Sequence, residues 1–259
     1  MLIDGIPECN VTTVLQNEKV TFNNAIVVSI EYRLPPENKV RSESRRDILC
    51  FWSSSLIAYI LSQFPIPTND CFDALLWLMD HSSEVGFDPS RVSIGGTSAG
   101  ANLAAVLAQR AYRAGIQINY QLLLVPVMHY GCVTKSCMEN ANIPLLGAKE
   151  VIWFHNMYAN SYEDGTDPHY NPLMYMEDCP PFFPRRGECG FENAVTLAPA
   201  MVVTAKKDTL RDDGLDLVEY LGGHCAVDVE HVELPGSHWS VYSHTDVYRE
   251  KLNAGVCGG

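Results

Sequence analysis

RVSIGGTSAGANLAAVLAQ, residues 91–109, holds an apolar run, a glycine-rich turn and a run of small residues in direct succession. The run before the turn predicts a strand, and the alanine-rich run after it predicts a helix. Gly96 and Gly100 flank Ser98 in a G-x-S-x-G pattern. Small flanking residues suit a sharp turn, because a larger side chain would collide with the neighbouring strand and helix. The turn therefore presents the Ser98 hydroxyl at the carboxyl edge of a sheet.

Strand and helix patterns alternate along most of the chain. Apolar, β-branched runs predict strands, which lie at residues 25–32, 91–96, 119–127, 200–205 and 227–234. Helical patterns lie between them, at residues 67–86, 98–115 and 210–221. For the first of these helices we expect Thr68, Asn69 or Asp70 as the N-cap residue. The alternation predicts an α/β fold, with a mostly parallel central sheet and helices on both faces.

Composition suits one globular domain over residues 1–259. Of the 259 residues, 47% are apolar and 10% aromatic, which is enough to build a substantial core. The formal net charge is −13 and there is no basic stripe to bind phosphates, so we expect no nucleic-acid partner. The apolar cluster at residues 51–61 is too short for a membrane span and contains three serines.

The cysteines and the opening residues predict a cytoplasmic protein. Nine cysteines at irregular spacing favour free, mostly buried thiols over a disulfide framework. The opening residues lack the basic and then apolar segment of a secretory signal. His129, Cys132 and Cys137 have the spacing H-x2-C-x4-C, which fits no common zinc pattern and has no evident fourth ligand. We therefore expect no metal and no cofactor.

Ser98 needs two partners if it is to act as a nucleophile. A serine hydroxyl attacks a carbonyl when a base takes its proton, and a third group must orient that base. Asp208 follows the strand at 200–205, and His238 lies in a Pro-Gly loop after the strand at 227–234. The order Ser, Asp, His is typical of enzymes whose nucleophile sits between a strand and a helix. We therefore predict Ser98 as nucleophile, His238 as general base and Asp208 as the acid that orients it.

Other residues near these three were considered for the oxyanion hole, the acid and the base. Ala99 begins the helix after the turn, and its N–H is placed to stabilise a developing oxyanion. Asp212 and Asp213 compete with Asp208 for the acid role, but they fall inside the next helix, whose N-terminus Asp212 is placed to cap. The remaining histidines do not follow a strand end in a small-residue loop, and we expect them to be surface or core residues: His81, His129, His155, His169, His224, His231 and His244.

Six stretches of the chain carry a family resemblance. They are VVSIEYRLPPE, DALLWLMDH, GFDPSRVSIGGTSAGANLAA, LLLVPV, APAMVVTAKKDTLRDDG and LPGSHW, and they span most of residues 25–239. In this order they resemble the hormone-sensitive-lipase-like branch of the α/β-hydrolase superfamily, which includes arylacetamide deacetylases. The resemblance implies a serine esterase that cleaves acetyl or short-acyl esters of small apolar or aromatic metabolites, with Ser98, Asp208 and His238 as its triad. Thr97 departs from the family's usual acidic residue, and His129 stands where aspartate is common.

The opening of the chain departs from that family. The family carries an H-G-G-G type segment whose N–H groups supply most of the oxyanion hole, and the first 24 residues here hold no Gly-rich turn. We also expect the N-terminal strands to be partly missing, which leaves a gap between the strands at 25–32 and 91–96. Loss of a single oxyanion donor costs about 10²-fold to 10³-fold in turnover. The alternative function is therefore a catalytically weak or inactive protein that binds a small ligand on the same fold.

Residues 40–63 interrupt the resemblance. Joining PENK directly to FPIPTNDC reproduces the family's pattern, so residues 40–63 are an excess. An intron begins with GT and ends with AG. Residue 40 is valine, whose codons start with GT, and residue 63 is glutamine, one of whose codons is CAG. We infer a translated intron; a real surface insertion is the alternative, because long loop insertions cost little free energy.

Residues 130–184 form an aromatic-rich segment with several prolines. We predict that this segment is a lid or lines a pocket, through Trp153, Phe154, Tyr158 and Tyr162. Packing in the core is an equal alternative for any one of these four side chains. The oligomeric state has no signature in the sequence.

Overall fold

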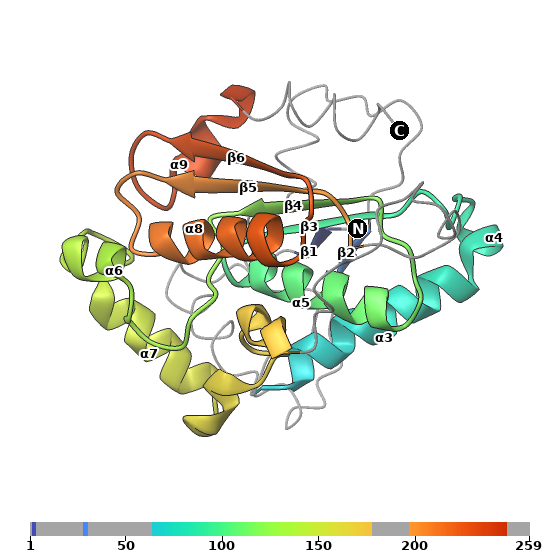
Figure 1. The fold of residues 1–259 in the computed structure, drawn as a ribbon, viewed down its shortest axis with the longest axis horizontal. Helices are drawn as coiled ribbons and strands as arrows, with labels where there is room; N and C mark the ends of the chain where they lie inside the picture. Colours follow the sequence, from blue (N-terminus) through green and yellow to red (C-terminus); the bar gives the residue numbers. More distant parts are fainter. Residues whose placement is uncertain (1, 4–27, 31–63, 178–196, 248–259) are drawn as a thin grey trace, which may run out of the picture.

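The computed structural model describes residues 2–3, 28–30, 64–177 and 197–247. Within these residues, parallel strands form one 6-stranded sheet in the order β2-β1-β3-β4-β5-β6 (Figure 1). The strands are β1 (Leu2–Ile3), β2 (Ser29–Ile30), β3 (Ser93–Thr97), β4 (Tyr120–Leu124), β5 (Ala200–Ala205) and β6 (Val229–Leu234). The predicted α/β class and mostly parallel sheet are confirmed.

The helices lie between and after these strands. They are α3 (Ile66–Asp80), α4 (Ser82–Val85), α5 (Ala99–Arg113), α6 (Lys135–Glu139), α7 (Ala148–Tyr158), α8 (Arg211–Glu219) and α9 (Ser240–Ser243). Three shorter turns of helix complete the series: η2 (Glu163–Thr166), η3 (Pro172–Glu177) and η4 (Tyr220–His224). None of the helices in the described ranges is long and apolar enough to cross a membrane.

The expected gap inside the sheet is wrong, because β1 fills it. Leu2 pairs with Ser29 of β2 on one side and with Gly95 of β3 on the other. Ile3 continues the ladder one residue further along. A strand of two residues is too short to show an alternating or apolar run, so pattern analysis has no means of finding it.

Helices cover both faces of the sheet, and β5 shows how the sequence produces this. Its six residues are all buried. Ala200 and Val202 belong to the apolar cluster that packs under α3, α5 and α8, whereas Met201 and Val203 belong to a second cluster that includes Val241 of α9. Successive side chains of a strand point to opposite faces, so an unbroken apolar run is needed where both faces are covered. Figure 1 shows α3, α5 and α8 on one side of the sheet and α9 on the other.

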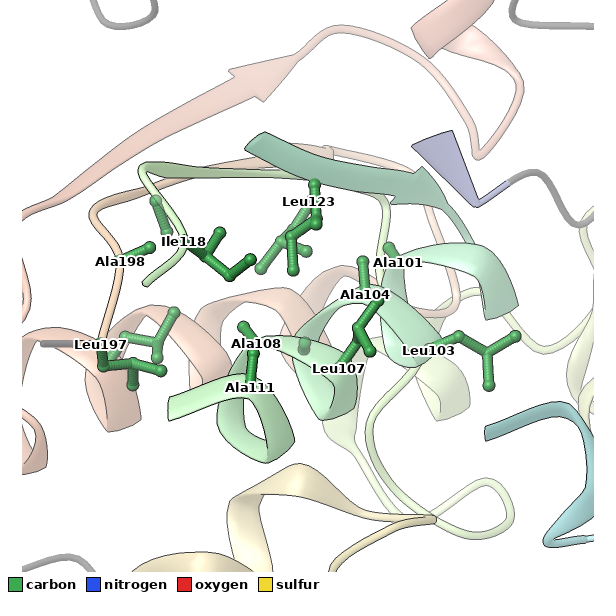
Figure 2. Packing of buried hydrophobic residues seen from close by; sticks show 14 of the residues in the cluster. Ala101, Leu103, Ala104, Leu107, Ala108, Ala111, Ile118, Leu123, Leu197 and Ala198 are labelled. Carbon is green, nitrogen blue, oxygen red and sulfur yellow. The ribbon is translucent and has the colours of Figure 1, made fainter. Parts of the chain in front are cut away.

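Small side chains bring α5 close to the sheet. All of its alanines after Ala99 are almost completely buried. Figure 2 shows Ile118 and Leu123 in the space between the sheet and this helix, opposite the alanine side chains. Because alanine adds little bulk, the helix axis can approach the sheet and still leave interior density at the level of an organic crystal. The turn that precedes α5 is therefore held against the strands.

The N-cap prediction for α3 is wrong. The helix begins at Ile66, two residues before the first of the three predicted capping residues, and no side chain caps it. Thr68 lies inside the first turn and donates its hydroxyl to the carbonyl of Pro65 at 2.7 Å. Pro67 is also in that turn, where a missing N–H costs nothing because the first amides of a helix have no partner. The two prolines therefore allow the helix to begin earlier than the polar residues suggest.

The prediction of free thiols is wrong for one pair of cysteines. Cys132 and Cys137 form a disulfide, with their Cα atoms 5.6 Å apart. The short chain between them turns back on itself and begins α6, which brings the two side chains together within the range a disulfide allows. Cys71 keeps a free thiol and is buried, and burial raises its pKa to about 12. With both sulfurs bonded, neither Cys132 nor Cys137 can supply a thiolate to a metal.

Two hypotheses from the sequence concern segments outside the described residues. One is the translated intron at residues 40–63. The other is the effect of the opening residues 4–24, where the family's Gly-rich oxyanion segment has no counterpart. Both stay hypotheses.

Candidate active site

The Ser98 turn has the strained backbone that its sequence predicts. Ser98 follows the last residue of β3 and precedes the first residue of α5, and its φ is 57° with ψ −120°. A non-glycine residue with positive φ costs of order 1–3 kcal/mol, so the surroundings must hold it in place. The Ser98 N–H donates to the carbonyl of Leu124 in β4 at 2.8 Å, and the Ser98 carbonyl accepts from the Ala101 N–H at 3.0 Å. The turn is thus fixed by both the neighbouring strand and the following helix.

Glycines and a free amide surround the turn. Gly96 is the last but one residue of β3, and Gly100 is buried in the first turn of α5. A Cβ atom on Gly95 would lie 2.8 Å from the carbonyl oxygen of Leu122, so a side chain there would push β3 away from β4. Ala99 is the first residue of α5, and the N–H groups of a helix's first turn have no carbonyl partner within the helix. Its amide is available to an anion next to Ser98.

Asn102 fixes α5 to two other segments, which the sequence analysis did not anticipate. Its side-chain NH2 group donates to the carbonyl of Val127 and to that of Tyr170, both at 2.9 Å. The hydrogen bond to Tyr170 is buried, so a water molecule cannot replace the amide there, whereas the hydrogen bond to Val127 is half-buried. A single polar residue among the small and apolar residues at 99–108 was the only signal in the sequence. Asn102 therefore holds the nucleophile helix to the segments that follow β4 and η2.

Asp208 and His238 lie together, as their positions after two adjacent strands predict. Nδ1 of His238 is 2.7 Å from Oδ2 of Asp208, and the two residues are 4% and 0% exposed. The other carboxylate oxygen, Oδ1, accepts the Leu210 N–H at 3.0 Å. Because each oxygen of the carboxylate has its own donor, the side chain has one preferred orientation. This arrangement leaves Nε2 of His238 as the ring nitrogen that can exchange a proton with a substrate or a nucleophile.

The loops that carry the two residues are joined by their backbones. The Lys206 N–H donates to the Leu234 carbonyl at 2.9 Å, and the Lys207 N–H donates to the Gly236 carbonyl at 2.7 Å. Gly236 has φ +92°, and a Cβ atom there would lie 2.4 Å from Oγ of Ser240. The PGSH sequence thus needs glycine for two reasons, its backbone conformation and the space beside it. The β5 and β6 loops extend from the sheet as one joined unit.

Asp212 and Asp213, the alternatives to Asp208 for the acid role, form hydrogen bonds elsewhere in the structure. Asp213 is buried in α8, where Oδ2 accepts the N–H groups of Met128 at 2.8 Å and His129 at 3.1 Å. Burial raises the pKa of Asp213 to about 6 despite these hydrogen bonds. Asp212 does not cap α8, contrary to the prediction: the helix begins at Arg211, and its N-cap residue is Leu210, which has no capping side chain. Asp212 instead accepts the Ser136 N–H at 2.7 Å, because α6 lies beside this end of α8.

The aromatic segment is split between surface and interior. Trp153 and Tyr162 are 43% and 71% exposed, so the structure does not place them around an enclosed pocket. Tyr158 packs edge-on against Phe64, and Phe154 contacts the apolar cluster around α6 and α7. Burial lowers the pKa of His155 to about 4, and its Nδ1 lies 2.6 Å from the hydroxyl of Tyr170. His155 is thus the core histidine of this segment.

Other histidines have partners at the surface or on the sheet. Nε2 of His129 lies 2.7 Å from Oδ2 of Asp216 in α8. Nε2 of His231 lies 2.9 Å from the hydroxyl of Thr204. In the ranges that the structure describes, three or more histidine, cysteine, aspartate and glutamate side chains do not gather anywhere as a potential metal site.

Comparisons with known proteins agree with this architecture. A family model described as an alpha/beta hydrolase fold matches residues 61–243. Esterase LipI of Mycobacterium tuberculosis is 33% identical over 199 residues, which are 76% of this chain and 50% of LipI. The ethyl acetate hydrolase of Pseudomonas putida is 29% identical over 176 residues, which are 67% of this chain and 50% of that protein. The solved structure of EstE1, a thermostable carboxylesterase cloned from a metagenomic library, matches with a TM-score of 0.65 at 28% identity, over 89% of this chain and 66% of EstE1.

The matches also define how much of the relatives is present. The chain spans about half the length of the curated relatives it matches. The stretch that the family model matches, residues 61–243, contains the Ser98 turn and the strands that lead to Asp208 and His238. What the whole of each relative does is therefore a starting point for a proposal about this chain.

Proposed function

Because this chain belongs to the hormone-sensitive-lipase-like branch of the α/β-hydrolase family, we propose that it is a serine carboxylesterase that forms an acyl-enzyme on Ser98. The observation that carries the proposal is the buried pairing of Asp208 with His238, 2.7 Å apart, on loops that follow adjacent strands of the sheet that carries the Ser98 turn. A base oriented by a buried carboxylate is what a serine nucleophile requires.

In the proposed reaction, the Ser98 Oγ attacks the ester carbonyl while Nε2 of His238 takes its proton. The C–O bond to the alcohol then breaks, and the protonated His238 returns that proton to the departing alkoxide. Asp208 stabilises the imidazolium that exists between these two steps and stays ionised throughout. Water then attacks the acyl-enzyme in the same way and releases the acid. The Ala99 N–H donates to the oxygen that carries negative charge in each tetrahedral intermediate.

For the substrate we propose acetyl or short-acyl esters of small apolar or aromatic alcohols. The support is the relatives' names, which are those of esterases and of an ethyl acetate hydrolase. The acidic net charge of −13 is consistent with a neutral substrate. A series of 4-nitrophenyl esters with acyl chains of two to twelve carbons tests this, and kcat/KM is expected to fall beyond the shortest members.

A fluorophosphonate probe tests the mechanism. The probe is expected to label Ser98, as located by mass spectrometry of the modified peptide. Ser98→Ala is expected to abolish labelling and His238→Ala to slow it by several orders of magnitude. Ser83→Ala and His224→Ala, at two exposed positions, are the matched controls and are expected to label like the unaltered protein. A folded protein that hydrolyses no ester and takes up no probe would contradict the proposal and favour the ligand-binding alternative.

A further inference from the structure

Helix α6 lies against the loop that carries Asp208. Figure 1 shows α6 beside the end of α8 at which that helix begins. The side-chain NH2 group of Asn140, just after α6, donates to the carbonyl of Asp208 at 3.1 Å and to that of Ser136 at 3.0 Å. The hydroxyl of Ser136 donates to the carbonyl of Thr209 at 2.9 Å. Two consecutive peptide carbonyls, those of residues 208 and 209, therefore have donors from one short helix.

The contact between the two helices is also reciprocal. Oγ of Ser136 accepts the N–H of Asp212 at 3.0 Å, while the N–H of Ser136 donates to Oδ2 of Asp212 at 2.7 Å. Ser136 is 0% exposed, as are Asp208 and Thr209. The hydrogen bond from Ser136 to Thr209 is buried, so loss of the Ser136 hydroxyl must either leave the Thr209 carbonyl unpaired or move the loop. The Asp208 carbonyl also accepts the Arg211 N–H at 3.3 Å, and the Asn140 amide is its second donor. Movement of this loop moves the Asp208 carboxylate with it.

The disulfide fixes α6 in this position. Cys132 lies before the helix and Cys137 within it, so the bond closes a loop that contains Ser136. Cys137 is buried and packs with Leu146, Val151 and Leu210. The Thr209 hydroxyl donates to the carbonyl of Leu146 at 3.1 Å, which joins the acid loop to the same cluster. A closed loop restricts the conformations that α6 can adopt when it separates from its partners.

We propose that Ser136 and Asn140 are positioning residues for the Asp208 carboxylate, and that the Cys132–Cys137 disulfide holds the helix that bears them. This inference rests on the proposed role of Asp208 as the acid of a serine esterase. Neither side chain touches a reacting atom; both act through the backbone of residues 208 and 209. A carboxylate displaced from Nδ1 of His238 stabilises the imidazolium less, so it slows proton transfer.

The test uses three variants: Asn140→Asp, Ser136→Ala and the double variant that carries both changes. Each is compared with Met138→Ala as the control. Asn140→Asp keeps the shape of the side chain but replaces its donor by an oxygen facing two carbonyl oxygens. Met138 lies on the same helix and is 68% exposed, which makes its alanine variant the control. Fluorophosphonate titration first gives the fraction of folded, active protein. The expected result for Asn140→Asp is a kcat roughly 10-fold lower per active site with KM unchanged, and an acidic limb of the kcat/KM profile shifted to lower pH.

A spectroscopic measurement separates this proposal from the proposed function. The proton on Nδ1 of His238 gives a downfield resonance when it is shared with a carboxylate, whether or not an ester is turned over. We expect this resonance in the unaltered protein and in Met138→Ala, and we expect it to shift or disappear in the combined variant. An unchanged resonance together with unchanged kcat and pH profile in the combined variant would overturn the positioning role. Absence of ester hydrolysis from a protein that shows the resonance would count against the esterase assignment alone.

The disulfide has its own variant. Replacing both cysteines, with Cys132→Ser and Cys137→Ser, is expected to lower kcat in the same direction as Asn140→Asp. A mild reductant is expected to have the same effect on the unaltered protein and none on the double serine variant. Unchanged kcat in the double variant would contradict the part of the proposal that concerns the disulfide.

Discussion

The hydroxyl of Tyr170 lies 2.6 Å from Nδ1 of His155, and both side chains are buried beneath α7 and the segment that follows it. Burial lowers the pKa of His155 from 6.5 to about 4 and so keeps the imidazole neutral, and the nearby His129 acts in the same direction. Figure 1 shows that this region lies below the helices that cover the sheet, away from β5 and β6. We therefore expect the His155–Tyr170 pair to contribute to the stability of the aromatic segment.

His155 makes stability depend on pH between about 6.5 and 4. In the unfolded chain His155 takes up a proton below pH 6.5, but in the folded protein it does so only below about pH 4. The free energy of unfolding therefore decreases as the pH is lowered through this window, by up to about 3 kcal/mol from this residue. His155→Phe is expected to flatten the decrease in urea unfolding measured at pH 7 and pH 4.5. His224→Phe, at an exposed position, is the control, and an equal slope in both variants would count against the assignment.

Gly236→Ala is expected to damage the His238 loop. The change forces a side chain into positive φ and places its Cβ 2.4 Å from Oγ of Ser240, so we expect a loss of about 2–4 kcal/mol in unfolding free energy. Gly86→Ala is the matched control, since Gly86 has φ +85° but no atom within 4 Å of an added Cβ. Gly86→Ala should lose only the unfolding free energy that corresponds to holding alanine at positive φ, and it should leave ester hydrolysis unchanged. Adding Ser240→Ala to Gly236→Ala should recover part of the loss; no recovery would show that the contact with Ser240 is unimportant.

Asn102→Leu is expected to destabilise the fold more than Gln109→Leu, about two turns further along α5. Asn102 donates to two carbonyls at 2.9 Å, and its loss removes a donor from the buried Tyr170 carbonyl and from the half-buried Val127 carbonyl, at about 2–4 kcal/mol. Gln109 donates once, to Pro172 at 3.2 Å, and its own Oε1 has no hydrogen-bond partner among the described residues. Leucine at 109 removes that unpaired oxygen together with the donor, so the net change should be small. Urea unfolding at pH 7 measures both, and equal losses would refute the comparison.

Ser98→Gly is expected to be more stable than Ser98→Ala, although both lose ester hydrolysis. The φ of 57° strains alanine as much as serine, whereas glycine adopts it freely. The difference in unfolding free energy should be about 1 kcal/mol or more, and differential scanning calorimetry of the two variants gives it as a difference in Tm. Equal Tm values would mean that the turn relaxes when the hydroxyl is removed.

The parts of the fold that were predictable from the sequence are those with a local signal. β5 lies at residues 200–205 as predicted, because five of the six residues in AMVVTA are apolar and the run is too short for a helix. The turn at Ser98 and the closeness of Asp208 and His238 also followed from position, since the ends of parallel strands meet at one edge of the sheet.

The features that were missed depend on contacts between distant segments. Asp212 has the sequence context of a helix cap, but α6 approaches this end of α8 and Ser136 takes its carboxylate. The Cys132–Cys137 disulfide and the two bonds of Asn102 likewise need a folded chain to bring their partners together. A two-residue strand such as β1 carries no period at all, and only the backbone groups left between β2 and β3 identify its place.

The pairing of β1 also determines the order in which the sheet can be completed. Leu2 pairs with Gly95, whereas Ser93 pairs with Tyr120, so the first of these contacts must close a far longer loop than the second. Contacts that close long loops form late in folding, after local units have gathered. On the ribosome, β1 emerges first but has no β3 to join until the Ser98 turn has been synthesised. The unit β3-α5-β4 is therefore the expected nucleus, and the amino-terminal edge of the sheet is the last part to be added.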